Sequence, residues 1–279
     1  MINDNNETLI VDTDEESNVD DVAFSPGPNA DSPSDIAQYI SPEVRGLYDV
    51  YSYRHAAAIL ANSFPQELAE IQNALLAFSI TQYDIGFPGG NESVMPKKFS
   101  RILRPKGWRE ARIQGDLHVR MQEFNEDFLP SGKAIKRKCS DGTPRIIPNY
   151  IDGHKIDYVK DRVAFDLEWN SKDQTFDRDL YALRAFHECG LISAGILVTR
   201  SASLNSVFNR IPLLNKMGQP ELYNTGPKAG IPKSCIGKYG ASTTWMGKLL
   251  YRLNAGRHGG CPVLVFGITP KLISDYEVA

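Results

Sequence analysis

Three acidic residues near the middle of the chain have the types and the spacing to hold a metal ion. Asp166 and Glu168 lie two positions apart in a stretch where apolar and polar residues alternate, which is typical of a β-strand whose alternate side chains share a face. Asp157 stands nine residues before Asp166 and reaches the same place if the chain bends before that strand. The pattern predicts three carboxylates that converge.

Converging carboxylates suit Mg²⁺, a hard cation that takes oxygen ligands and usually binds one or two carboxylates together with water and substrate phosphate. A metal held in this way favours phosphodiester hydrolysis, because it activates water and neutralises the charge that develops on the phosphate oxygens. The alternative is a solvent-facing strand whose acids pair with Lys155, Lys160 and Lys172. Spacing alone favours this structural alternative, although clustered acids without a cation weaken a fold.

The elements around these acids alternate between strands and helices. A strand, a helix and a second strand within about 35 residues imply a right-handed crossover and parallel pairing. Pro65 is well placed to begin an earlier helix that turns Leu68, Ile71, Leu75 and Leu76 to one side. The predicted elements are helix 65–80, strand 159–170, helix 176–190, strand 194–201, helix 243–253 and strand 263–268. They predict an α/β fold.

Several classes of function are excluded by what the sequence lacks. No apolar run approaches the roughly 20 residues that cross a bilayer, so we expect a cytoplasmic protein. The stretch GKYGASTTWMGK (237–248) lacks the order of a nucleotide-binding P-loop, and the five histidines lack zinc-binding spacing. No organic cofactor is predicted. Ser242 or Thr243 most simply caps the helix that follows.

A resemblance to a known family emerges at the acidic segment. The stretch DYVKDRVAFDLEWN (157–170) resembles the active-site segment of the BglII and BstYI-type restriction endonucleases, which belong to the PD-(D/E)xK nuclease superfamily. Further similarity lies, in the same order and spacing, in VYSYRHAA (50–57), FPQELAEIQNALL (64–76), KGWRE (106–110) and CPVLVFGITP (261–270). These stretches cover most of residues 48–270. The resemblance implies a restriction-endonuclease-like core, a central mixed sheet flanked by helices.

The resemblance also implies roles for single residues. Asp157 and Asp166 correspond to the acids that hold the catalytic Mg²⁺, and all three acids are the predicted catalytic residues. Glu168 occupies the position of the motif's lysine; the BglII-like group is similar in having an amide or an acid there. We expect Glu168 to bind a water or a second cation. A competing register pairs Glu168 with Asn170 instead. Asn170 and Lys172 either support the acidic residues or contact DNA. The alternative is purely structural, with Asn170 capping the end of the strand and Lys172 solvated.

The implied function is that of a type II restriction endonuclease, a homodimer that cuts double-stranded DNA at a short palindrome, depends on Mg²⁺ and leaves 5′-phosphates. The resemblance also implies a DNA methyltransferase in the host that does not contact this protein directly. No membrane partner is expected. The alternatives are a repair or recombination nuclease of the same superfamily and a DNA-binding protein without catalysis. Discrete DNA bands on a gel would distinguish a restriction endonuclease from a repair or recombination nuclease. An Asp157→Asn variant that keeps its function would identify a DNA-binding protein without catalysis.

Charge is distributed unevenly along the chain. The net charge is −3, but residues 1–35 hold ten acids and no Lys or Arg, which leaves 31 basic and 24 acidic residues in a body of charge +7. A basic body suits a polyanion such as DNA. We expect residues 1–36 to form a disordered acidic tail and residues 37–279 a single nuclease domain. A basic cluster at Lys133, Lys136, Arg137 and Lys138 is expected in a loop.

Overall fold

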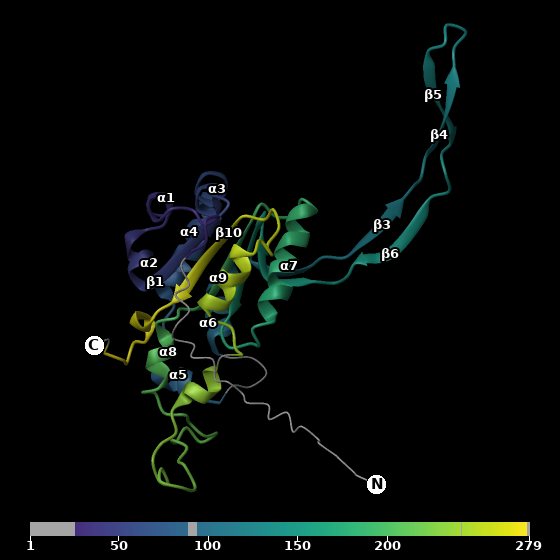
Figure 1. Ribbon diagram of the computed structural model, residues 1–279. Helices are drawn as coiled ribbons and strands as arrows, with labels where there is room; N and C mark the ends of the chain where they lie inside the picture. Colours follow the sequence, from purple (N-terminus) through teal and green to yellow (C-terminus); the bar gives the residue numbers. More distant parts are fainter. Residues whose placement is uncertain (1–25, 89–93, 241, 278–279) are drawn as a thin grey trace, which may run out of the picture.

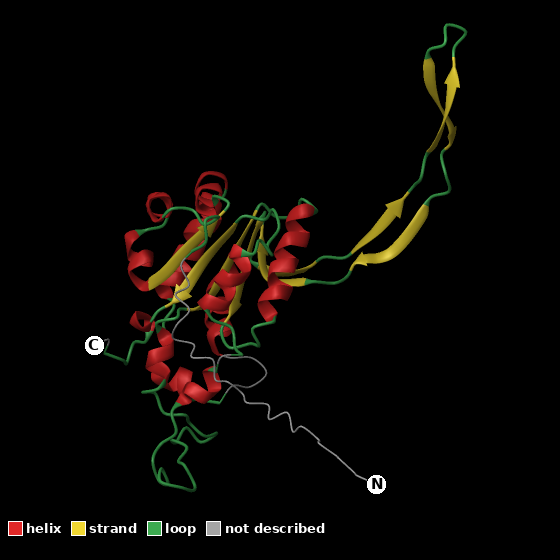
Figure 2. Cartoon of the chain, in the orientation of Figure 1, coloured by secondary structure: helices red, strands yellow, loops and turns green. Residues whose placement is uncertain are grey.

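The computed structural model describes residues 26–88, 94–240 and 242–277. Its centre is a sheet made of β1 (Tyr48–Tyr53), β2 (Arg109–Arg112), β7 (Lys155–Lys160), β8 (Val163–Glu168), β9 (Ala194–Arg200) and β10 (Val263–Ile268). The order across this six-stranded sheet is β1-β10-β9-β8-β7-β2. The three middle strands are parallel and the outer pairings antiparallel, so the sheet is mixed. Helices flank the sheet (Figures 1 and 2), which confirms the predicted fold class.

The helices fall on two sides of the sheet. The cluster of apolar side chains on one side includes α1 (Pro33–Tyr39), α2 (Pro42–Leu47), α3 (Ala56–Ser63), α4 (Pro65–Ala77) and α6 (Val94–Leu103). The cluster on the other side is built on α7 (Thr175–Glu188) and α9 (Met246–Asn254). Short helices complete the body: α5 (Gln82–Gly86), η2 (Arg104–Lys106), α8 (Leu204–Phe208), η3 (Cys235–Tyr239) and η4 (Pro270–Leu272). No helix in the described ranges is long and apolar enough to cross a membrane.

Strand β8 is buried on both sides, and its alternation decides where its acids point. Phe165 and Leu167 pack into the cluster with α4 and α6, whereas Ala164 packs into the cluster with α7 and α9. Successive side chains of a strand point to opposite faces. Asp166 and Glu168 are therefore directed to the α7 side, as the alternating sequence predicted.

Helix α4 begins at Pro65 as predicted, but one residue of its predicted apolar face is misplaced. Leu68, Ile71 and Leu75 are buried, while Leu76 is 41% exposed and Ala74 is buried in its stead. Each residue of an α-helix turns by about 100°, so the position after Leu75 leaves the stripe that the other three define.

The ordered body begins earlier than predicted. Residues 1–25 of the predicted tail lie outside the described residues, but residues 26–36 belong to the body. Pro33 begins α1, the Ser32 hydroxyl accepts a hydrogen bond from the Asp35 amide at the N-cap, and Ile36 is buried. The composition, rich in Pro and Ser, predicts disorder there, but proline at the first turn and serine at the N-cap are also how helices begin.

A long arm, residues 115–151, leaves the body between β2 and β7. It consists of β3 (Gly115–Val119) paired with β6 (Arg145–Ile151) and, farther out, β4 (Glu123–Phe128) paired with β5 (Ala134–Ser140). Figure 1 shows it standing clear of the body. The basic cluster predicted to lie in a loop lies largely on a strand, since Lys136, Arg137 and Lys138 belong to β5.

The predicted cap of α9 is wrong. The helix begins at Met246 after Trp245, which makes no side-chain capping bond. The Thr243 hydroxyl instead donates to the Gly240 carbonyl at 2.7 Å and accepts from Arg200 Nη2 at 2.6 Å. A hydroxyl near a helix start caps it only when the chain brings that hydroxyl to the first free amides.

The close packing of α7 on the sheet gives a first prediction. A Cβ added at Gly195 of β9 would lie 2.7 Å from Leu183 Cδ2 of α7. We expect Gly195→Ala to reduce the free energy of unfolding by about 1–3 kcal/mol through overpacking, and Leu183→Ala by about 2–5 kcal/mol through a cavity. In the double variant the new methyl enters that cavity, so urea denaturation should show a loss smaller than the sum of the two.

The control is Gly46→Ala in α2, where nothing lies within 4 Å of the added Cβ. Alanine there should leave the protein as stable or stabilise it by about 0.5–1 kcal/mol. Strictly additive losses at Gly195 and Leu183 would contradict the packing described.

Candidate active site

The three predicted acids come together at the carboxyl end of β8. Asp166 is buried within the strand, and Glu168 is its last residue. In β7, Val159 and Ile156 lie opposite Arg109 and Ala111, so three steps of β7 span two steps of β2. This bulge is the bend that the sequence required at Asp157. The amide of Asp157 donates to Asp166 Oδ1 at 3.0 Å, which joins the two positions directly.

A fourth acid that was not predicted joins the group from α7. Asp179 is 2% exposed; its charge acts on Asp166, and the charge of Glu168 acts on it. The preceding residue, Arg178, places a positively charged side chain beside two of the acids. Its Nη2 lies 3.0 Å from Asp179 Oδ1 and 3.5 Å from Glu168 Oε1. One signal was available in the sequence, because Asp179 falls on the same helical stripe as the buried Phe176 and Leu183.

Burial and mutual repulsion hold protons on these acids. Burial, followed by the charges of Asp179 and Asp157, raises the pKa of Asp166 well above its ordinary value. Burial and the charge of Glu168 raise the pKa of Asp179 to about 8, against the attraction of Arg178. Burial likewise raises the pKa of Glu168. Ionisation of these groups near neutral pH therefore lowers the free energy of unfolding.

The three lysines that the structural alternative pairs with the acids make other contacts. Lys155 Nζ lies 2.8 Å from Glu110 Oε1, and Lys160 Nζ lies 2.8 Å from Glu70 Oε1. Lys172 is exposed and pairs through its backbone with Thr243. The geometry thus argues against the alternative in which the acids only pair with neighbouring lysines.

Asn170 takes a position at the margin of the acids. Its Nδ2 donates to the Lys238 carbonyl at 3.1 Å and ties the chain after β8 to η3. Its amide is thus directed toward η3, whereas Asp157 and Asp166 are bonded to each other. This arrangement favours the register that pairs Asp166 with Glu168 over the one that pairs Glu168 with Asn170.

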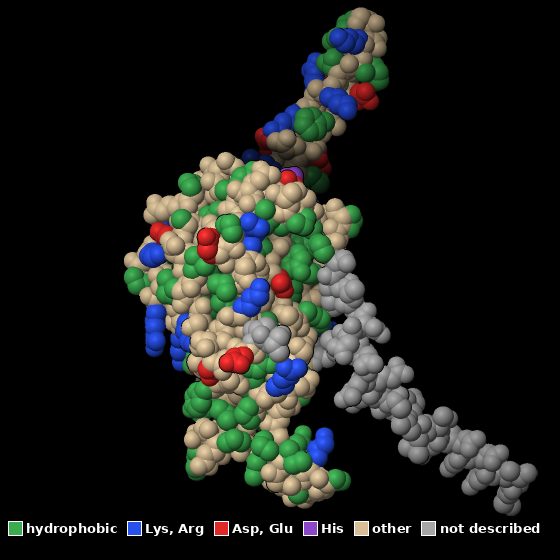
Figure 3. Space-filling view, turned by 90° about the vertical axis from the view of Figure 1, so that its left-hand side faces the viewer, with side chains coloured by type: hydrophobic (Ala, Val, Ile, Leu, Met, Phe, Trp, Pro, Cys, Tyr) green, Lys and Arg blue, Asp and Glu red, His purple; other side chains and the backbone are tan. Residues whose placement is uncertain are grey.

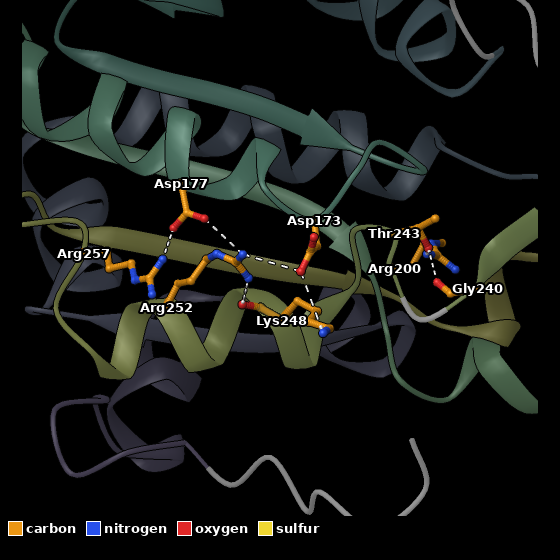
Figure 4. A network of polar contacts seen from close by, with 8 residues as sticks. All are labelled: Asp173, Asp177, Arg200, Gly240, Thr243, Lys248, Arg252 and Arg257. Atoms are coloured by element: carbon orange, nitrogen blue, oxygen red, sulfur yellow. Dashed lines mark hydrogen bonds and ion pairs between the residues drawn. The ribbon is translucent and has the colours of Figure 1, made fainter. Parts of the chain in front are cut away.

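Two sets of polar contacts fix the elements around the acids. Figure 4 shows the first set, and of the second it shows the contacts of Thr243 with Arg200 and Gly240. Between α7 and α9, Arg252 Nη2 lies 3.0 Å from Asp177 Oδ2 and 3.6 Å from Asp173 Oδ2. At the end of β9, Arg200 is fully buried and its Nε donates to the Trp169 carbonyl at 2.7 Å. The first set orients the helix that carries Asp179, and the second holds the residue after Glu168.

The donor set fits a hard divalent cation. Asp179 Oδ2 is buried and has no hydrogen-bond partner among the described residues. A buried carboxylate oxygen without a partner is costly unless a proton or a cation satisfies it. Within the described ranges, no three His, Cys, Asp or Glu side chains already form a metal-binding group. One or two carboxylates with water and substrate oxygens would thus hold the ion, as is usual for Mg²⁺.

The mixed sheet with acids at the end of a central strand is consistent with a restriction-endonuclease-like fold. The family model of restriction endonuclease BglII/BglIII matches residues 48–268, from β1 to β10, and includes all four acids. The chain belongs to this family, and its class of activity is that of a type II site-specific deoxyribonuclease, a phosphodiester hydrolase acting on double-stranded DNA. This membership favours restriction over repair and sets aside a non-catalytic function. None of the curated proteins matches the chain.

The raised pKa of Asp179 predicts how stability depends on pH. Because the folded-state pKa of about 8 exceeds the ordinary value of about 3.9, ionisation of Asp179 costs stability as pH rises from 4 to 8. Without divalent ions, Asp179→Asn should raise the melting temperature at pH 9 by at least about 2–4 °C, the shift that 1 kcal/mol produces in a domain of this size. Near pH 4 the difference should vanish.

Asp177 provides the matched control on the same helix. Despite partial burial, its ion pairs with Arg257 and Arg252 lower the pKa of Asp177. This carboxylate stabilises the fold above its unfolded pKa, so Asp177→Asn should lower the melting temperature at pH 7–9 and lose its effect below about pH 4. Equal shifts for both variants would contradict the electrostatics described.

Proposed function

We propose that this chain cuts both strands of duplex DNA at a short palindromic site as a Mg²⁺-dependent homodimer and leaves 5′-phosphates. The observation that carries the proposal is the group of four acids at the end of β8, whose buried carboxylates a divalent cation would relieve. Enzymes of the family generally use Mg²⁺. A twofold DNA site is matched most economically by a twofold protein.

Each acid has a role in this proposal. Asp157 and Asp166 hold Mg²⁺, which when bound lowers the pKa of a water and neutralises charge on the scissile phosphate. The Asp157 amide keeps Asp166 in place through the 3.0 Å hydrogen bond. Glu168 accepts a hydrogen bond from the attacking water and orients it toward phosphorus. Asp179 adds negative charge behind the cation.

Arg178 supplies positive charge next to Glu168, the residue that stands at the position of the motif's lysine. Its guanidinium is 63% exposed and lies 3.5 Å from Glu168 Oε1. An exposed guanidinium at that distance can orient Glu168 and contact the phosphate oxygens bidentately. Lys172 is exposed on the loop that joins β8 to α7, and Asn170 supports the end of β8; we assign Lys172 to the DNA backbone.

The enzyme acts in the cytoplasm in this proposal, where a host methyltransferase protects the cell's own sites without touching it. We also assign residues 1–25 to an acidic tail and the rest of the chain to one nuclease domain.

The test is cleavage of unmethylated phage DNA in the presence of excess Mg²⁺. Wild-type protein should give discrete bands that EDTA abolishes. Asp166→Asn should lower the cleavage rate by at least about 100-fold while DNA binding in a gel shift persists, because one carboxylate that holds the metal becomes neutral. The control, Asp152→Asn at the root of the arm, removes an acid whose side chain is 81% exposed and should cut normally.

A smear instead of bands would refute site specificity, and cleavage that resists EDTA would refute the metal. Bands from Asp166→Asn at the wild-type rate would exclude this residue from the site.

Substitution of Glu168 separates its two possible roles. If Glu168 orients water as an acceptor, Glu168→Gln keeps a carbonyl oxygen and should retain most activity, within about tenfold, whereas Glu168→Ala should lose about 10²–10⁴-fold. Single-turnover rates measured over a range of Mg²⁺ concentrations check this. Equal losses for both variants, with a higher Mg²⁺ requirement for Gln, would show that Glu168 holds a second cation.

A further inference from the structure

The arm exposes an unusual amount of apolar surface. Phe128 is 70% exposed and Met121 is 68% exposed. Single exposed apolar residues are normal on a soluble protein, but a concentration of them on one element marks an interaction surface. A two-stranded hairpin is also only marginally stable alone in water. The exposed large apolar residues of the arm are Val119, Met121, Phe124, Phe128, Leu129, Ile146 and Tyr150.

The charges of the arm are separated by strand. β4 carries Glu123, Glu126 and Asp127 and no Lys or Arg, while β5 carries three basic residues and no acid. Over residues 115–151 six Lys and Arg balance five Asp and Glu. A surface that binds the phosphate backbone needs an excess of positive charge. Figure 3 shows basic, acidic and apolar side chains along the arm together, rather than a basic face.

The strand register places these features on a common face. Phe124 lies opposite Lys138, Glu126 opposite Lys136 and Phe128 opposite Ala134. Directly opposed residues of an antiparallel pair point to the same side of the hairpin. One face therefore presents two phenylalanines, with acid on the β4 edge and lysines on the β5 edge.

The arm begins beside the acids of the site. β6 ends at Ile151, β7 begins at Lys155, and Asp157 follows two residues later. From there each side of the arm can extend by up to roughly 55–60 Å, at about 3.3 Å per residue. DNA bound at the acids thus lies next to the root of the arm, and the outer strands reach past it.

We propose that the arm packs face to face against the arm of a second copy of this chain, with β4 of each facing β5 of the other. A twofold axis along the arms brings the acidic strand of one copy against the basic strand of its partner and buries Phe124 and Phe128 between them. The proposal rests on the proposed function only in taking two copies to act on one duplex.

The test measures energy transfer between arm tips in the full-length chain, without DNA or metal. Ser131 at the tip becomes the labelled cysteine, and the exposed Cys139 and Cys189 become serine, while Cys235 and Cys261 are buried. Donor-labelled and acceptor-labelled batches are mixed. We expect efficient transfer between tips lying side by side, and its loss in Phe124→Ala/Phe128→Ala.

Charge exchange makes the test specific to arm-to-arm contact. The acidic arm, Lys136→Glu, and the basic arm, Glu126→Lys, change a base and an acid that lie on the face of Phe124 and Phe128, and each should associate with itself at least about tenfold more weakly than the parent. A mixture of the two should recover transfer, because each strand again faces its opposite charge. Recovery in the mixture also shows that both variant arms are folded.

No transfer in the parent, or no recovery in the mixture, overturns the proposal. If the basic arm instead binds DNA more tightly without recovery in the mixture, the arm is a DNA contact. The two proposals fail separately: cleavage without tip transfer contradicts only arm pairing, and tip transfer without cleavage contradicts only the proposed function.

Discussion

The structure depends on keeping several carboxylates together in a place that excludes water. Asp166 and Asp179 are both buried; the charge of Asp179 raises the pKa of Asp166, and the charge of Glu168 raises the pKa of Asp179. Such a group opposes folding, so packing elsewhere must offset it. β8 is covered on both faces, and α7 packs so closely on β9 that Leu183 leaves no room for a side chain at Gly195. The apolar layers on either side of β8 supply the stability that the acids reduce.

Position is controlled by a few backbone and side-chain contacts rather than by the acids themselves. The bulge in β7 brings the Asp157 amide to Asp166, and Arg252 joins α9 to the first turn of the helix that carries Asp179. Arg200, fully buried, fixes the carbonyl of Trp169 just beyond Glu168. Carboxylates that repel one another would separate if these elements could move, so the rigidity of the surrounding structure keeps them ready to bind a cation.

The sequence allowed the central part of this arrangement to be predicted, and the reasons for the misses are physical. Alternation in β8 and helical periodicity in α7 both arise from burial, so the direction of Asp166 and Glu168 was readable. Asp179 was missed because periodicity predicts that a position faces inward without telling what it meets there. The β4–β5 strands were missed because they are exposed on both faces and leave no apolar alternation. Thr243 was misjudged as a cap because its hydroxyl bonds to Arg200, a partner 43 residues away.

In the proposed site Glu168 stands where the superfamily motif has lysine, so an acid replaces a permanent positive charge at this position. Arg178 restores part of the balance, but with its side chain 63% exposed its attraction is screened by solvent. The excess of negative charge is therefore left to protons or to a divalent cation, and these compete for the same oxygens. Since the pKa of Asp166 is raised well above its ordinary value and that of its neighbour Asp179 is about 8, a cation that binds near neutral pH competes with protons held by this group of acids. Cation affinity, and with it activity, should rise with pH through this range, whereas a lysine at position 168 would lower the pKa values of the acids and weaken that dependence.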